Sequence, residues 1–198
     1  MTEGISKLSS ELGCPTIADP QLIALARESK EEALEVMYNA YKTRIYTFLL
    51  RLSADPETSD DLTQDVFTKA YVALGTLTND HRVLPWLYRI ANNAAIDHVR
   101  RRRRFTWLRV GKLAGTGEEP VMPDEHGRVP ERDQVRALLA TLPPEQATAL
   151  LLHSLEGYSY REIAEIQGCT LTAVRSRIAR GRAAFKVTYA TTEARHTS

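Results

Sequence analysis

The chain contains 198 residues, with 26 Lys and Arg against 25 Asp and Glu, which gives a formal net charge of +1. Hydrophobic residues make up 43% and charged residues 26%, as in globular proteins, which excludes a wholly disordered chain. Two cysteines, Cys14 and Cys169, are too few for a disulfide scaffold or a zinc site of cysteine ligands, and they fit a reducing compartment. We find no apolar run long enough to cross a bilayer and no signal peptide, so we expect a cytoplasmic protein without a membrane span.

Apolar residues recur at spacings of three and four along most of the chain, and strand-like alternation is scarce. We therefore expect an all-α protein. The expected helices span about 20–28, 30–53, 59–74, 85–104, 131–142, 144–156, 160–167 and 171–187.

Local signals place several of the helix ends. Thr58 with Asp61 predicts a capping box for the third helix, and Pro85 predicts the first turn of the fourth. Ser159 with Glu162 predicts a second capping box, and Gly168 predicts the end of that helix.

Composition divides these helices into two units. Residues 105–130 carry four Gly and three Pro with no period, which predicts a flexible linker. We expect two small helical domains at 21–104 and 131–190, the linker at 105–130, an N-terminal extension at 1–20 and a tail at 191–198.

The near-zero net charge conceals strong segregation. Residues 51–80 carry a net charge of −4, residues 81–104 carry +6, and residues 131–198 carry +2. Asymmetry of this kind indicates more than one partner surface.

The last unit has the pattern of a DNA-reading helix-turn-helix: a short helix, a Gly turn and a longer basic helix. Ala164 is small where the two helices would cross, and Gly168 suits the turn. The alternative is a solvated basic helix on a small bundle. The short helix, the small Ala164, the Gly turn and the basic second helix together favour DNA binding. Some of the basic side chains would contact phosphates and others would contact base edges. The second helix carries these cations: Arg175, Arg177, Arg180, Arg182 and Lys186.

Two segments of the first unit add to this signal. Residues 60–67, DDLTQDVF, combine an apolar face with an exposed stripe of acids and an amide, which suits a basic partner helix. Residues 86–104 place Trp86, Asn93, Asp97, Arg100 and Arg104 near one side of a helix. Aromatic, amide and arginine side chains of this kind suit DNA with unstacked bases. Taken alone, a solvated stripe and a core tryptophan would explain these features as well.

Together these segments resemble a sigma factor of the sigma-70 family, in the compact extracytoplasmic-function (ECF) group. DDLTQDVF resembles region 2.2, PWLYRIANNAAIDHVRRRRR resembles regions 2.3 and 2.4, and residues 142–185 resemble region 4. The resemblance implies a non-enzymatic protein that binds core RNA polymerase, directs it to promoters through the −35 and −10 elements, and promotes melting. We expect no cofactor, and because the five histidines show no ligand spacing we expect no bound metal. The resemblance implies an anti-sigma protein as a partner, and the linker would let the two units close on each other or on that protein.

The resemblance also assigns roles to individual residues. The β′ clamp helices of the polymerase would meet Asp61, Gln64, Asp65 and Phe67. The −10 element would meet Asn79, Asp80, Arg82, Trp86, Asn93, Arg100, Arg101 and Arg104, with Trp86 beside the melted strand or beneath the loop as its support. The −35 element would meet Arg175, Ser176, Arg177, Ala179, Arg180 and Arg182, of which Arg177 and Arg182 would hold phosphates or the β flap. In the linker, Glu118, Glu119, Asp124 and Glu125 would imitate nucleic-acid charge.

Two other classes of function are alternatives. A stand-alone helix-turn-helix regulator would bind DNA without polymerase, but it leaves the patterns at 60–67 and 86–104 unexplained. An enzyme is disfavoured because the sequence has no phosphate loop, nucleophile elbow, metal motif or paired catalytic carboxylates.

Overall fold

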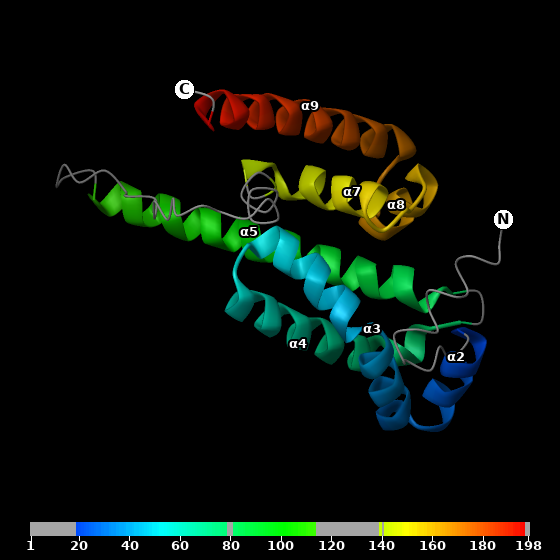
Figure 1. Cartoon of the computed structure of the whole chain (residues 1–198). Coiled ribbons are helices and arrows are strands. Elements are labelled where there is room, and N and C mark those ends of the chain that lie inside the picture. The colour runs from blue at the N-terminus through cyan, green and yellow to red at the C-terminus, as the bar shows by residue number, and fades with distance from the viewer. Residues whose placement is uncertain (1–18, 79–80, 114–138, 140, 197–198) are drawn as a thin grey trace.

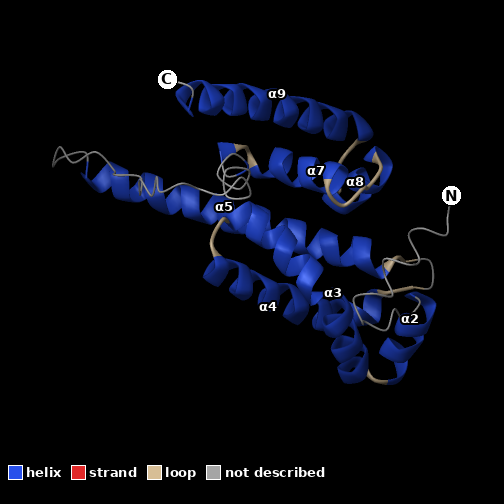
Figure 2. Cartoon of the chain, viewed as in Figure 1, coloured by secondary structure: helices blue, strands red, loops and turns tan. Residues whose placement is uncertain are grey.

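The computed structural model describes residues 19–78, 81–113, 139 and 141–196. Seven α-helices, one short 3-10 helix (η1) and no strand occur in these residues (Figure 2), so the all-α expectation is confirmed. The helices are α2 (Asp19–Glu28), α3 (Lys30–Ser53), α4 (Pro56–Ala73), η1 (Leu74–Thr76), α5 (Val83–Leu113), α7 (Pro144–Ser154), α8 (Tyr160–Gln167) and α9 (Leu171–His196). We call α2–α5 the first unit and α7–α9 the second unit.

The corner between α3 and α4 is built by a cap that the sequence pattern misplaced. Asp55, not Thr58, is the N-cap of α4, and its Oδ2 accepts a hydrogen bond from the Thr58 backbone N–H at 2.9 Å. The predicted Thr58–Asp61 capping box is therefore wrong. Pro56 follows at the first position, where its missing N–H costs no hydrogen bond. The preceding residue, Ala54, ends α3 in the left-handed conformation with φ of 59°.

Helix α5 is longer at both ends than predicted. It begins at Val83, two residues before Pro85, and it continues nine residues past the predicted end at Arg104, to Leu113. Arginine is a good helix former and no Pro or Gly occurs between Arg100 and Val110, so nothing local ends the helix at the predicted linker boundary. The rest of the predicted linker up to residue 130, including the four acids assigned to charge imitation, lies outside the described residues.

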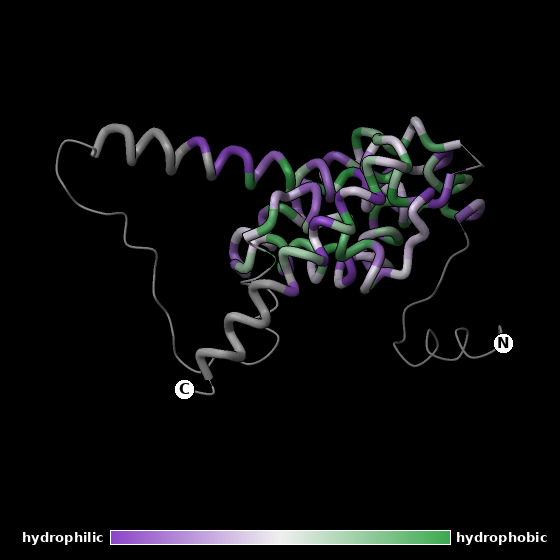
Figure 3. Tube along the Cα trace, turned by 90° about the horizontal axis from the view of Figure 1, so that it is seen from above, coloured by the Kyte–Doolittle hydropathy of each residue, from purple (hydrophilic) through white to green (hydrophobic). Residues whose placement is uncertain are grey.

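The two units share one hydrophobic core. Buried side chains of both units form a single cluster, in which α5 contacts α3 and α4 of the first unit and α7 and α8 of the second. Figure 1 shows the second unit lying along α5 on the side away from α4. Figure 3 shows the hydrophilic, arginine-rich part of α5 projecting from the helical body.

The described part of the chain contains neither a helix that could span a membrane nor a cluster of metal-ligating side chains. None of its helices combines the length and apolar composition that crossing a membrane requires. Its His, Cys, Asp and Glu side chains form no group of three that could hold a metal ion.

Candidate nucleic-acid interface

The outer face of α4 carries the acidic stripe that the sequence predicted. Asp61 and Gln64 are exposed, and Asp65 is half-buried with its Oδ2 2.7 Å from Lys69 Nζ. Phe67 differs from its neighbours because it is only 4% exposed and its ring meets the edge of Tyr38. Its side chain supports the stripe from within the core and offers no free surface.

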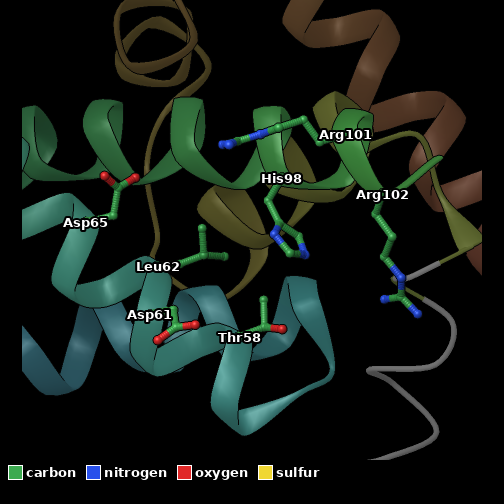
Figure 4. Close-up of a pocket in the computed structure, with 7 residues that line it drawn as sticks. All are labelled: Thr58, Asp61, Leu62, Asp65, His98, Arg101 and Arg102. Carbon is green, nitrogen blue, oxygen red and sulfur yellow. The ribbon is translucent and has the colours of Figure 1, made fainter. Parts of the chain in front are cut away.

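A groove of about 420 Å³ runs between this stripe and α5 (Figure 4). Asp61 and Asp65 line the α4 wall, and Arg101 and Arg102 line the α5 wall. His98 lies between the arginines and α4. Burial, followed by the positive charges of Arg102 and Arg101, lowers the pKa of His98 below its ordinary value, although Asp55 opposes the shift. The groove thus presents carboxylates and guanidinium groups on opposite walls around an imidazole that resists protonation.

The residues assigned to the −10 element lie mainly on α5. Asn93, Arg101 and Arg104 are exposed, while Trp86 is half-buried and packs against the core. Asn79 and Asp80 lie outside the described residues. An exposed amide and a run of arginines on one helix can bind both base edges and phosphates.

Two arginines of this set already have partners in the second unit. The Arg82 guanidinium donates a hydrogen bond to Glu162 Oε1 in the first turn of α8. The Arg100 guanidinium donates to Glu145 Oε1 in the first turn of α7 at 2.6 Å. The surface that the sequence assigned to DNA is therefore covered in part by acids of the same chain.

A third acid of the second unit, Glu156, is the centre of the contact between the units. Its Oε2 accepts a hydrogen bond from the Tyr88 hydroxyl at 2.6 Å and lies 3.3 Å from Arg44 Nη2. Its Oε1 lies 3.5 Å from Arg51 Nη1. Burial and the Glu156 carboxylate together raise the pKa of Tyr88 strongly, so this hydroxyl stays protonated and donates. No spacing in the sequence connects residues so far apart in the chain, so this cluster could not be predicted from the sequence.

Both predicted caps of α8, the first helix of the helix-turn-helix, are present. The Ser159 hydroxyl accepts from the Glu162 backbone N–H, and the Glu162 carboxylate accepts from the Ser159 backbone N–H at 2.9 Å, so the predicted capping box is confirmed. Gly168 ends α8 with φ of 59°, a conformation that glycine adopts without a Cβ penalty. Val174 and Ile178 then bury one face of α9 against α7 and α8.

The opposite face of α9 is open. Arg175, Ala179, Arg180 and Arg182 are exposed, and Ser176 is half-buried. A helix-turn-helix places such side chains in the major groove. Helix α9 continues to His196, beyond the predicted end near Val187.

Arg177 differs from the other cations of α9, because it points into the motif. Its Nη1 donates to Gln167 Oε1 at 2.8 Å and lies 3.0 Å from Cys169 Sγ. Gln167 Nε2 in turn donates to Thr148 Oγ1 on α7 at 2.7 Å. The side chain of Arg177 thus fixes the turn to both flanking helices, a role that the sequence pattern did not reveal.

Comparison with known proteins decides the family. The model of sigma-70 region 2 matches residues 37–105, and the model of sigma-70 region 4 matches residues 132–185. The RNA polymerase sigma-H factor of Pseudomonas aeruginosa is 32% identical over 180 residues, which cover 84% of this chain and 91% of that protein. The chain belongs to the sigma-70 family, in its ECF group. As an ECF sigma factor it directs RNA polymerase to promoters and is not an enzyme.

Two further relatives agree with this assignment. The ECF RNA polymerase sigma factor SigM of Bacillus subtilis is 27% identical over 157 residues, covering 79% of this sigma factor and 94% of SigM. The solved structure of the sigma factor RpoE of Bartonella quintana, in complex with the anti-sigma factor NepR, matches with a TM-score of 0.59 and 25% identity. That match covers 77% of this chain and 93% of the other. The region 2 match also accounts for the part of the chain that a stand-alone regulator left unexplained.

Proposed function

We propose that this ECF sigma factor binds core polymerase through the α4 stripe, contacts the −10 element through α5, and reads the −35 element through the open face of α9. The observation that supports it best is that Asp61 and Asp65 of α4 line one groove together with the exposed Arg101 and Arg102 of α5. An acidic surface suits a basic polymerase helix, and the arginines suit phosphates.

The proposal assigns the residues as follows. Asp61, Gln64 and Asp65 contact the β′ clamp helices, with Phe67 as support from the core. Arg82, Trp86, Asn93, Arg100, Arg101 and Arg104, with Asn79 and Asp80 in the preceding loop, serve the −10 element. Arg175, Ser176, Ala179 and Arg180 serve the −35 element, while Arg182 holds a phosphate or the β flap and Arg177 holds the turn in place.

The domain divisions are part of the proposal. We assign residues 21–104 to the polymerase and −10 domain and 131–190 to the −35 domain. The cytoplasm is the compartment that contains its partners. The Bartonella relative was solved with an anti-sigma factor, which supports an anti-sigma partner for this chain as well.

Transcription by purified core polymerase on a library of promoter-bearing DNA fragments, with and without this chain, tests the proposal. Specific initiation is expected only when the chain is present. Asp61→Arg is expected to weaken polymerase binding at least about tenfold, because it puts a like charge against a basic partner. Glu35→Arg makes the same charge change on an exposed residue of α3 and is expected to leave binding unchanged. Equal losses in both variants would contradict the assignment of the α4 stripe.

A further inference from the structure

Asn92 of α5 carries a polar atom that the fold does not satisfy. The residue is 1% exposed, and among the buried side-chain nitrogen and oxygen atoms that the structure describes, its Oδ1 alone has no hydrogen-bond partner. A buried carbonyl oxygen without a donor lowers stability, because folding removes its water and supplies no replacement. The presence of an amide at this position therefore requires an explanation other than stability.

The other buried polar side chains of the described residues are satisfied inside the fold. Each has a hydroxyl that donates to a backbone carbonyl oxygen; they are Ser53, Ser59, Thr63 and Thr148. Asn92 differs from them, because its Nδ2 donates to the side-chain Oδ1 of the next residue, Asn93, at 3.3 Å. The hydrogen bond of this buried amide thus goes to a side chain that is itself exposed.

Asn93 is the amide that we assign to the −10 element. An asparagine amide has an acceptor end, Oδ1, and a donor end, Nδ2, of nearly the same shape. A free amide can turn either end toward a base, so it distinguishes poorly between donors and acceptors on the base edge. The Asn93 amide is not free in this sense, because its Oδ1 holds the hydrogen bond from Asn92. Turning it over would set two NH₂ groups against each other, so Nδ2 is the end left for DNA.

We propose that Asn92 is a positioning residue for −10 recognition: its buried amide holds Asn93 with Nδ2 outward, so that Asn93 donates a hydrogen bond to the base edge. This inference rests on the proposed −10 contact of Asn93. It adds a residue that touches no DNA, and it assigns the chemistry of the base contact as donation to an acceptor such as purine N7 or thymine O2. A buried side chain suits this role, because packing restricts its rotamers and so fixes the group that it orients.

The test measures open-complex formation by core polymerase carrying the full chain. Its rate on a promoter recovered from the fragment library, divided by the rate on each single-base −10 variant, gives a discrimination ratio. Asn92→Leu branches at the same atom as asparagine but cannot form hydrogen bonds. It is expected to lower the ratio at one −10 position at least about threefold and to leave the melting temperature unchanged or higher. The control, Ser59→Ala, removes a buried hydroxyl with two partners and is expected to show the opposite pattern, a lower melting temperature with an unchanged ratio.

A double-mutant cycle with Asn93→Ala separates positioning from any other effect of the substitution. If Asn92 acts through Asn93, adding Asn92→Leu to Asn93→Ala causes no further loss of discrimination. A further loss equal to that of Asn92→Leu alone would overturn the inference, and so would an unchanged ratio in Asn92→Leu. Asn92→Ala, which cannot overpack the site, takes the same place in the cycle if the leucine variant unfolds. A wild-type chain that gives no promoter-specific initiation would instead contradict the proposed function, so the two failures are distinguishable.

Discussion

The Tyr88 hydroxyl donates a 2.6 Å hydrogen bond to Glu156 across a sequence separation of 68 residues. Tyr88 lies in region 2 and Glu156 in region 4 of the sigma factor. Both groups are shielded from solvent, and the carboxylate also meets Arg44 and Arg51. This contact makes the stability of one region depend on the other.

Replacing Tyr88 with Phe keeps the ring contacts and removes only this hydrogen bond. Hydrogen bonds to charged groups contribute about 1.5–3 kcal/mol, so Tyr88→Phe is expected to lower the free energy of unfolding by about that amount. Urea denaturation followed by circular dichroism measures the change. Tyr46→Phe, on the half-buried side of α3, is the matched control and is expected to change little. A loss no larger than that of the control would show that the bond to Glu156 adds no stability.

The arginines of α9 are expected to divide into two classes. Arg180→Ala should reduce discrimination between −35 sequences by about 1–3 kcal/mol if it removes a bidentate base contact, with little change in stability. Arg177→Ala should instead destabilise the fold by about 1 kcal/mol, because Gln167 loses a half-buried hydrogen bond to a charged donor. Binding to a panel of duplexes and thermal unfolding measure the two effects. An Arg177→Ala variant with normal stability and altered sequence preference would reverse the assignment.

Ala54 offers a stabilising substitution. A side chain in the left-handed region costs about 1–2 kcal/mol, so Ala54→Gly is expected to raise the free energy of unfolding by up to about 1 kcal/mol after the entropy cost of glycine is subtracted. Ala40→Gly, in the interior of α3, is expected to lower it by about the same amount. Denaturant unfolding of both variants gives the two signs, and two changes of the same sign would contradict the conformational explanation.

His98 predicts a pH dependence. Its pKa in the folded chain is lowered by burial and by Arg102 and Arg101, so the unfolded chain takes up this proton at a higher pH than the folded chain. Stability is therefore present above the ordinary histidine pKa and is lost as the pH falls through it. The melting temperature should fall between about pH 7.5 and about pH 5.5, and His98→Gln should flatten the fall. The pKa values of the Glu145 and Glu162 carboxylates are also lowered. These groups change stability only at lower pH, because their ordinary pKa of 4.5 lies below this window. An equally steep fall in His98→Gln would assign the dependence to other groups.

The sequence predicted those features that depend on neighbouring residues. Periodicity located the helices that the structure describes, whereas the predicted helix at 131–142 lies mostly outside the described residues. Ser159 with Glu162 located the start of α8, because a capping box joins residues only three positions apart. The same rule failed at α4, where Asp55 stands three residues before Thr58 and its side chain caps the helix. Charge segregation likewise predicted an acidic stripe on α4 and a basic α5.

Contacts between distant segments could not be predicted in this way. From the sequence, Arg100 and Arg177 are equally suitable as phosphate ligands. In the structure Arg100 pairs with Glu145, and Arg177 donates a hydrogen bond to Gln167. Which arginine is engaged within the fold depends on how α7 and α8 pack against α5, and helix periodicity contains no information on that packing. The resemblance assigned Phe67 to the polymerase surface, yet its side chain is buried against Tyr38.

The Glu162 side chain makes two structural contacts at once. Its carboxylate closes the capping box of α8 through Ser159, and it also accepts a hydrogen bond from Arg82 of the other unit. The start of the DNA-reading motif and the edge of the contact between units therefore share one side chain. A replacement that frees Arg82 also loosens the first turn of α8, whereas a shorter acid fails to satisfy both partners. Any genetic screen for altered promoter choice in this sigma factor should thus recover mutations at this position with mixed phenotypes, in which defects of folding and of DNA recognition appear together.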